Sequence, residues 1–376
     1  MSARIFFVAA LVVAGYWSLR FAYADELFRA NTSSSVRRAA ELDAGNARYH
    51  AWLAEMEQYE GRSPAAELEI ASALNPSDSA VWIRRGLHAE GERDLARAEE
   101  NLLEAARRDK LYAPRWALAN YYARRGDLNR FWPWARQALA IGYDDLSPMF
   151  RLCWSVTNDA ELIRSQAIPP QHSVLAKYLA FLTREDHLDA AESIVRDLVA
   201  QTVPADTPAL LNYCDRLIER KRTAAAVSVW KALFPPASTT LTNGSFENEP
   251  LQQGFDWRAP PQPGISVTRS RSPAALRLRL SGKQPEHCEL LFQFIPLTPG
   301  TTYTFRFEYK TVLRGLRWSV GAMARSAELK AAEWTPFELP FSVGNDSLAR
   351  LVLTYDREPG AVREEGEIWL RNATIR

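Results

Sequence analysis

Hydrolysis of a glycosidic bond needs two carboxyl groups that face one another across a cleft. In the C-terminal part of this sequence the candidate carboxyl groups are Glu247, Asp256, Glu308 and Asp356. Each of them lies on a different predicted element, and no spacing pairs any two. The sequence also lacks the motifs of nucleotide-phosphate binding, of α/β-hydrolases and of zinc metalloproteases. We therefore predict that the protein is not an enzyme.

The three cysteines, Cys153, Cys214 and Cys288, are far apart and odd in number. This pattern predicts neither a disulfide framework nor a zinc site, although one long-range disulfide remains an alternative. His287 precedes Cys288, but neighbours along a strand point to opposite faces. A cysteine–histidine nucleophile is therefore not expected there.

The composition is that of an ordinary globular protein and excludes one class of partner. The chain has 376 residues, a length typical of two to three domains. Lysine and arginine number 46 against 45 aspartate and glutamate, for a net charge of +1. Nucleic-acid binding usually requires a strongly basic domain, so no nucleic-acid partner is predicted.

An apolar run, Ile5–Leu19, follows Arg4 near the N-terminus and predicts a membrane partner. A cleaved signal peptide would end at the small residues of Ala22-Tyr23-Ala24. An uncleaved anchor needs about 20 residues, which Ile5–Ala24 supplies if Arg20 reaches the interface. A buried helix of a cytoplasmic protein is a third interpretation.

The residues after the apolar run favour the anchor. Neither glycine nor proline lies between Tyr16 and Ala30, and apolar residues recur there at helical spacing. One helix should therefore continue from residues 1–24, the membrane segment, into the soluble part. We predict a single-pass anchor with the soluble domains on the extracytoplasmic, periplasmic side. Secretion after signal cleavage is the alternative.

Residues 25–235 show a helical repeat. Trp82 and Trp116 are 34 residues apart, and so are Ala191 and Ala225. The best unit, Ser79–Ala113, places Gly86 four residues after its tryptophan. Together with "NARYHAWLAEMEQYEG" before it and "APRWALANYYARRGD" after it, this unit resembles the tetratricopeptide repeat family. The match is good over 45–145 and weaker over 172–235.

The resemblance implies an α-solenoid whose concave face binds a protein partner. The first helix of each pair would line that face. The candidates on these helices are Trp52, Ile83, Leu87, Asn120, Tyr121 and Arg124. The alternative for each aromatic residue is packing between helices. Capture of a carboxyl-terminal peptide is not supported, because Asn120 with Arg124 is only a fragment of the required clamp.

Past the prolines of "FPPAST" at 234–239, alternation replaces helical spacing. In "TTYTFRFEYKT" the residues Tyr303, Phe305, Phe307 and Tyr309 share one face and polar residues share the other. About eight such short segments, separated by proline, glycine and asparagine turns, predict an antiparallel β-sandwich or jelly roll over 236–376. The predicted fold class is therefore α then β, with an N-terminal membrane helix, an α-solenoid and a C-terminal sandwich.

The strand region contains "NGSFE", "GFDW", "PGTTYTFRFEYK", "WTPFELPF" and "GEIWLRNATI" in that order. Together they resemble the galactose-binding-like jelly rolls of carbohydrate-binding modules over 240–376. The resemblance implies that Glu247 is one ligand of a structural calcium. Its partner in the last strand would be an aspartate, where this sequence has Arg371 or Asn372. Calcium prefers several carboxylate ligands, and this motif supplies only Glu247. The sequence therefore predicts no cofactor, with a structural calcium as the alternative.

Sugar binding needs exposed aromatic faces beside hydrogen-bonding side chains. The candidates for glycan contact are Trp318, Tyr355, Trp369, Arg277 and Arg306. The alternative for each aromatic residue is core packing. The basic outer face of the predicted strands could meet an acidic polysaccharide, the repeat array, or only water.

Two functional hypotheses follow. The first is an envelope-anchored scaffold that binds protein through the repeats and glycan through the sandwich, serving polysaccharide or cell-surface assembly. The second is a pure protein–protein scaffold whose sandwich binds no sugar.

Overall fold

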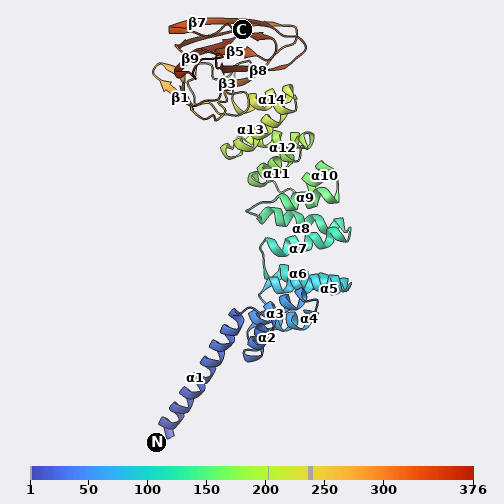
Figure 1. Ribbon diagram of the computed structural model, residues 1–376. Helices are drawn as coiled ribbons and strands as arrows, with labels where there is room; N and C mark the ends of the chain where they lie inside the picture. The colour runs from blue at the N-terminus through green and yellow to red at the C-terminus, as the bar shows by residue number, and fades with distance from the viewer. Residues whose placement is uncertain (1, 202, 236–239) are drawn as a thin grey trace. The chain divides into compact units, whose positions relative to one another are not determined.

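The computed structural model describes residues 2–201, 203–235 and 240–376. Across these residues fourteen α-helices are followed by two antiparallel sheets, which confirms the predicted fold class (Figure 1). The chain divides into two compact units, Met1–Val174 and Leu175–Arg376. The second unit holds the last helices together with both sheets. The predicted domain boundary at 235/236 adjoins residues 236–239, which lie outside the described residues.

The helices up to residue 166 pack as successive pairs joined by short turns. Their bounds are α1 Ser2–Arg29, α2 Ser33–Leu42, α3 Ala47–Tyr59, α4 Ala65–Leu74, α5 Ser79–Gly91, α6 Leu95–Arg108, α7 Tyr112–Arg124, α8 Leu128–Ile141, α9 Ser147–Val156 and α10 Ala160–Gln166. Aspartates cap several of these helices, as Asp78 does for α5 by accepting the Ala80 N–H at 3.0 Å.

Gly86 on α5 shows why the repeat needs a small residue at this position. A Cβ atom there would lie 2.6 Å from Cγ of Leu102 on α6. Two helices that pack this closely leave no room for a larger side chain. The two helices of the pair therefore interlock closely.

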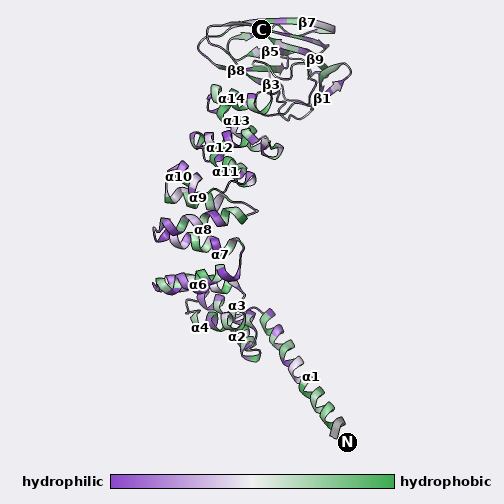
Figure 2. Cartoon of the chain, turned by 180° about the vertical axis from the view of Figure 1, so that it is seen from behind, coloured by the Kyte–Doolittle hydropathy of each residue, from purple (hydrophilic) through white to green (hydrophobic). Residues whose placement is uncertain are grey.

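Helix α1 is continuous from the apolar run into the first pair, as predicted. Its N-terminal part is exposed, and Figure 2 colours most of it as hydrophobic. The segment Ile5–Arg29 is long and apolar enough to cross a membrane. Further along the same helix, Ala24 is 0% exposed and packs in a cluster with Val36, Ala39 and Tyr49. One helix therefore carries both a membrane-type surface and part of the first repeat core.

The described residues of the second unit contain helices and nine strands. α11 His172–Arg184 crosses the division between the units, and α12 Leu188–Gln201, α13 Thr207–Glu219 and α14 Thr223–Leu233 follow it. The strands are β1 Ile265–Arg271, β2 Ala274–Ser281, β3 His287–Pro296, β4 Thr302–Thr311, β5 Leu316–Val320, β6 Ala324–Arg325, β7 Ala331–Ser342, β8 Leu348–Asp356 and β9 Glu365–Ile375.

The strands form a five-stranded sheet in the order β1-β2-β9-β4-β7 and a four-stranded sheet in the order β3-β8-β5-β6. The core between them contains Phe246, Trp257, Phe305 and Trp318. On β4, Phe305, Phe307 and Tyr309 are buried and the residues between them face outward, as the alternation predicts. The same alternation places charged residues on the outer face of each sheet.

The segment that begins the strand region is held by the last strand. Gly244 accepts the Ala373 N–H at 2.8 Å, and a Cβ atom on Gly244 would overlap the Ala373 carbonyl. The glycine is therefore required for a close approach of two backbones. In this turn it is Asn243, and not Gly244, that adopts the left-handed conformation, with a φ of 51°. Phe246 is buried in the core.

Helices α13 and α14 pack directly on the loop that leads into the strands. Asp215 on α13 accepts the Gly254 N–H at 2.6 Å and lies 2.5 Å from Nη2 of Arg258. Trp230 on α14 contacts Phe255 edge to face, with ring centroids 6.1 Å apart. These contacts explain why the last helical pair and the sandwich belong to one compact unit.

Candidate functional site

The outer face of the five-stranded sheet carries two indole rings between cationic side chains. Trp369 on β9 stands directly between Arg277 on β2 and Lys310 on β4 in the strand register. The Arg277 guanidinium lies 5.4 Å from the centre of the Trp369 ring, and the Lys310 amine lies 5.0 Å from it. Trp334 on β7 extends the row, with Lys310 at 5.4 Å and Arg371 at 4.1 Å. This row of alternating cations and indoles is called the cation–indole row below.

Carboxylates hold the arginines of the row in place. Glu308 accepts two hydrogen bonds from Arg371, at 2.8 and 2.7 Å, and one from the amide of Asn372 at 2.8 Å. The hydrogen bonds from Asn372 and Arg371 lower the pKa of Glu308. Glu367 pairs with Arg277, and this hydrogen bond lowers the pKa of the Glu367 carboxyl group. Both carboxylates are therefore ionised and paired with an arginine at neutral pH.

Lys310 differs from the arginines around it. Within residues 2–201, 203–235 and 240–376 its side chain forms no ion pair or hydrogen bond, and its amine lies beside the two indole rings. Arg306 on the same strand is paired with Glu338 at 2.9 Å. The cation–indole row thus has a central positive charge that no carboxylate of the described chain neutralises.

The structure places the predicted glycan residues in two different environments. Trp369, Arg277 and Arg306 lie together on the outer face of the five-stranded sheet. Trp318 and Tyr355 are 1% and 0% exposed, so the prediction that they contact a glycan is wrong. Their rings face the core because they alternate on β5 and β8 with the outward residues. Lys310 and Trp334 were not among the residues predicted to contact a glycan.

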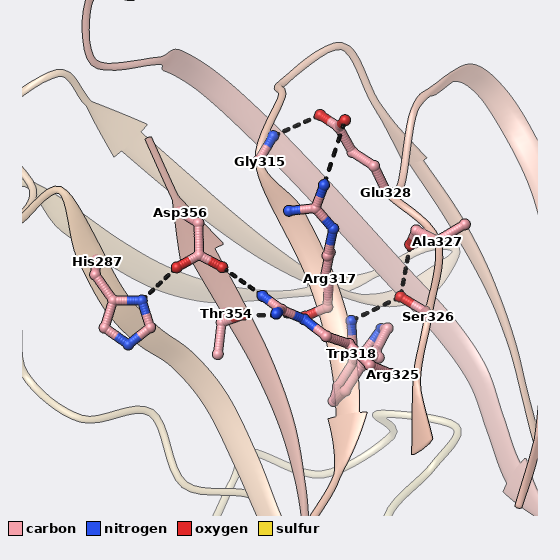
Figure 3. A network of polar contacts seen from close by, with 10 residues as sticks. All are labelled: His287, Gly315, Arg317, Trp318, Arg325, Ser326, Ala327, Glu328, Thr354 and Asp356. Carbon is pink, nitrogen blue, oxygen red and sulfur yellow. Dashed lines mark hydrogen bonds and ion pairs between the residues drawn. The ribbon is translucent and has the colours of Figure 1, made fainter. Parts of the chain in front are cut away.

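The outer face of the four-stranded sheet carries a second polar network (Figure 3). Asp356 on β8 binds the imidazole of His287 on one side and Nη2 of Arg325 at 2.9 Å on the other. Nearby, Glu328 accepts the Gly315 N–H at 2.6 Å and lies 3.9 Å from Arg317. The charged groups drawn in Figure 3 are thus paired with one another. The network is of the kind that stabilises an exposed sheet face.

The histidine of this network has no thiol beside it. His287 is exposed, whereas Cys288 is buried and burial raises the pKa of its thiol to about 11. The two side chains lie on opposite faces of β3, as predicted. Cys153, Cys214 and Cys288 are all free and buried, so the alternative of a long-range disulfide is wrong.

Glu247, the predicted calcium ligand, lies on the surface. Its backbone carbonyl accepts a hydrogen bond from Arg269 at 2.7 Å, and its carboxylate is in an exposed residue. Asn372, named with it from the sequence, is bound to Glu308. Among the described residues no group of three or more His, Cys, Asp or Glu side chains is placed to hold a metal ion. The role of Glu247 as a calcium ligand stays a prediction.

Ion pairs join the first helices of successive pairs. Arg84 on α5 binds Glu55 on α3 at 2.6 Å. Arg124 on α7 binds Glu90 on α5 through Nε at 2.8 Å and Nη2 at 2.6 Å. The side chain of Arg124 is exposed, so it orders neighbouring helices and still reaches solvent.

The remaining predicted partner-binding residues differ in exposure. Tyr121 is 0% exposed and donates its hydroxyl to the Leu95 carbonyl at 2.8 Å, so its predicted contact with a partner is wrong. Trp52 is half-buried beside the α1–α3 core and donates to Asn31 at 2.7 Å. Asn120 donates to the Trp116 carbonyl of its own helix at 2.8 Å.

Ile83 and Leu87 lie four residues apart on α5. Ile83 is partly exposed and Leu87 is 46% exposed, so an apolar surface remains on this helix. It is flanked by the paired side chains of Arg84 and Glu90. Interfaces have an apolar centre and a polar rim, so this surface is a candidate for contact with a protein segment.

A cleft of about 740 Å³ lies within the second unit, where α14 begins beside the ends of strands. Its polar lining includes Lys221, Thr223, Thr298 and Ser347. The Ser347 and Thr223 hydroxyls are hydrogen-bonded to each other at 3.1 Å. None of the sequence-predicted site residues lines this cleft.

A scan of protein families and a search of curated proteins find no match. Solved structures resemble each part. "CBM4 structure and function" is 14% identical over 36% of this chain and 98% of that chain, with a TM-score of 0.27. "YrrB: a TPR protein with an unusual peptide-binding site" is 14% identical over 54% and 92%, with a TM-score of 0.27. "PilW, widely conserved type IV pilus biogenesis factor" is 14% identical over 59% and 96%, with a TM-score of 0.29.

These neighbours include tetratricopeptide repeat proteins for the helical part and a carbohydrate-binding module for the strands, the two resemblances predicted from the sequence. Their low identities and TM-scores carry no argument about activity. The functional argument therefore depends on the residues of this chain.

Proposed function

We propose that the protein is a non-enzymatic scaffold, anchored in a membrane by α1, whose helical pairs bind protein partners. The continuity of α1 carries the proposal. The exposed, apolar part of α1 and Ala24, which is fully buried in the first repeat core, belong to the same unbroken helix. The proposed membrane anchor and part of the first repeat core thus belong to one helix.

The same helix favours an anchor over a cleaved signal. Cleavage after Ala24 would remove the buried side chain and the hydrogen bond from Arg20 to the Leu42 carbonyl. We place the soluble part on the periplasmic side and infer a role in polysaccharide or cell-surface assembly. Secretion after cleavage is the alternative that an intact N-terminus on the mature protein would exclude.

The surface proposed for a protein partner is centred on Leu87 and Ile83, with Arg124 nearby on the next repeat. An exposed leucine flanked by charged residues supplies apolar contact area, and the flanking ion pairs would set the orientation of the bound segment. Leu111, which is 69% exposed at the start of α7, offers a matched exposed leucine outside this surface.

The test compares Leu87→Asp with Leu111→Asp in the full chain, purified from native membranes after cross-linking. We expect Leu87→Asp to lose proteins that the unsubstituted chain captures, and Leu111→Asp to keep them. Capture of the same proteins by both variants would contradict the proposed surface. Circular dichroism of each variant checks that the helices stay folded.

A second candidate function is favoured by Lys310. We propose that the cation–indole row binds an acidic polysaccharide, whose carboxylate would pair with the Lys310 amine while its ring contacts the indole edges. A neutral glycan has no group to match this charge. The faces of both indoles are already beside cations, so simple stacking of a neutral sugar is the weaker alternative.

Lys310→Met tests this candidate, because methionine keeps much of the apolar contact and removes the charge. Lys330→Met is the control at an exposed lysine elsewhere in the sandwich. We expect the full chain to be retained by immobilised polygalacturonate and not by neutral glucan, with retention lost only in Lys310→Met. Absence of retention on any acidic polysaccharide would leave the pure protein–protein scaffold as the function.

A further inference from the structure

We propose that the corner between α2 and α3, residues 43–46, rests on the phospholipid headgroups of the membrane that α1 crosses. This inference depends on the proposed anchoring by α1 and adds a second membrane contact. The anchor alone would allow the first repeat to stand away from the surface. The contacts of Arg20 indicate that the first repeat lies directly at the membrane surface.

A hydrogen bond fixes the level of the corner along α1. Nε of Arg20 donates to the carbonyl of Leu42, the last residue of α2, at 2.7 Å. The C-terminal end of α2 therefore lies beside residue 20 of α1. Four residues further on, Ala24 is enclosed by Val36 and Ala39 of α2. From Arg20 onward, one face of α1 packs against the repeat and buries Ala24, while Phe21 and Tyr23 on the other face stay exposed.

The apolar run before Arg20 is short. Ile5–Leu19 has 15 residues, and at 1.5 Å per residue it spans about 22 Å. The hydrocarbon core of a bilayer is about 30 Å thick. A run this short spans only if the bilayer thins and flanking residues reach into the headgroups. All of the apolar residues before Arg20 are needed to cross the hydrocarbon core, so Arg20 should lie at the membrane surface.

Aromatic residues mark the same level. Tyr16, Trp17 and Phe21 are exposed on α1, and the rings of Trp17 and Phe21 lie 5.5 Å apart. The guanidinium of Arg20 lies 4.9 Å from the centre of the Trp17 ring. Tyrosine and tryptophan favour the membrane–water interface. Residues 16–21 therefore lie at the interface, and the end of α2 lies there with them.

The chemistry of the corner suits a zwitterionic surface. Ala44 and Gly45 are exposed and have no long side chain that would hold lipid away. Asn46 donates its amide to the carboxylate of Asp43 at 3.2 Å, and Arg48, two residues later, is exposed. One acidic and one basic group at the corner match the paired charges of phosphatidylcholine. A strongly anionic surface would repel Asp43.

The experiment places a fluorophore on Ala44→Cys or Gln58→Cys in the full chain, reconstituted in phosphatidylcholine vesicles with headgroup nitroxide lipids. The two positions are exposed. Ala44 lies just before the start of α3 and Gln58 lies near its C-terminal end, so about 17 Å of helix separates the two labels. The three native cysteines are buried, and the unsubstituted chain measures their background labelling.

We expect the headgroup nitroxide to quench the label at Ala44 and leave the label at Gln58 bright. Equal quenching at the two positions, in protein that floats with the vesicles, would overturn the corner contact and keep the anchor. Protein that does not float would overturn the anchor itself. Quenching at Ala44 that appears only in anionic vesicles would contradict the zwitterionic partner.

Discussion

Asp215 on α13 and Arg258 before the strands form an ion pair, with a carboxylate oxygen 2.5 Å from Nη2 of the arginine. The same oxygen accepts the Gly254 N–H, and Arg258 also donates to the Gly254 carbonyl at 2.9 Å. Both charged side chains are about four-fifths buried. One carboxylate therefore fixes a helix, a loop turn and the first residues of the sandwich.

Asp215→Asn should destabilise the second unit by about 2 kcal/mol, because it leaves the Arg258 guanidinium buried without a counter-charge. Hydrogen exchange of residues 251–258 and thermal unfolding of the full chain measure the effect. Glu249→Gln is the control, since the Glu249 carboxylate that pairs with Arg269 is exposed and its loss should cost less than about 1 kcal/mol. Equal losses in the two variants would show that burial of the Asp215 pair does not matter.

Gly254→Ala should be more destabilising than Gly282→Ala. Both glycines have positive φ, 60° and 76°, so alanine is strained at either site. A Cβ atom at Gly254 would also overlap the Trp230 ring, whereas nothing lies within 4 Å at Gly282. We expect about 1 kcal/mol at Gly282 from backbone strain and a further 1–3 kcal/mol, roughly, at Gly254 from overpacking. Chemical denaturation of both variants measures the difference.

The stability contributed by Glu308 should depend on pH. Its folded pKa is lowered by hydrogen bonds from Asn372 and Arg371, so its stabilisation is complete above the ordinary value of 4.5. It is lost as pH falls through the lowered pKa. Glu308→Gln should therefore be less stable than the unsubstituted chain at neutral pH, and the difference should shrink on acidification. A difference that stays constant from pH 7 to about pH 3 would contradict the assigned cause.

A chain that begins at Asp25 should have a less stable first repeat than one that begins at Arg20. The longer chain keeps buried Ala24 and the bond from Arg20 to Leu42. We expect the shorter chain to lose about 1–3 kcal/mol, measured as faster hydrogen exchange in α2 and α3. Identical exchange in both chains would show that the C-terminal half of α1 is dispensable to the repeat.

Local patterns predicted the fold well because they report directly on packing. The alternation around Phe305 and Phe307 requires one buried face, and Gly86 opposite a large residue requires two close helices. The continuity of α1 was also predictable, since nothing between Tyr16 and Ala30 breaks a helix. These features depend on neighbours in the sequence, so they can be recognised without the structure.

The site was harder to predict because it depends on partners far along the chain. Trp318 shares a face with Leu316 and Val320, a signal of burial that was present in the sequence. Tyr121 was less predictable, because its hydroxyl bonds a carbonyl 26 residues away. The meeting of Lys310 with Trp334 and Trp369 requires the order of β9, β4 and β7, which no local pattern contains.

The unbroken α1 also limits how the protein searches for partners. A scaffold on a flexible linker samples a volume of solution above its membrane, and its effective concentration there depends on linker length. If α1 crosses the membrane as proposed, the first repeat would follow every rotation and tilt of the helix in the bilayer. Encounters with other membrane proteins would then be governed by lateral diffusion within a thin layer at a constant height. A partner that presents its binding segment outside that layer would have to bring the segment to the surface itself.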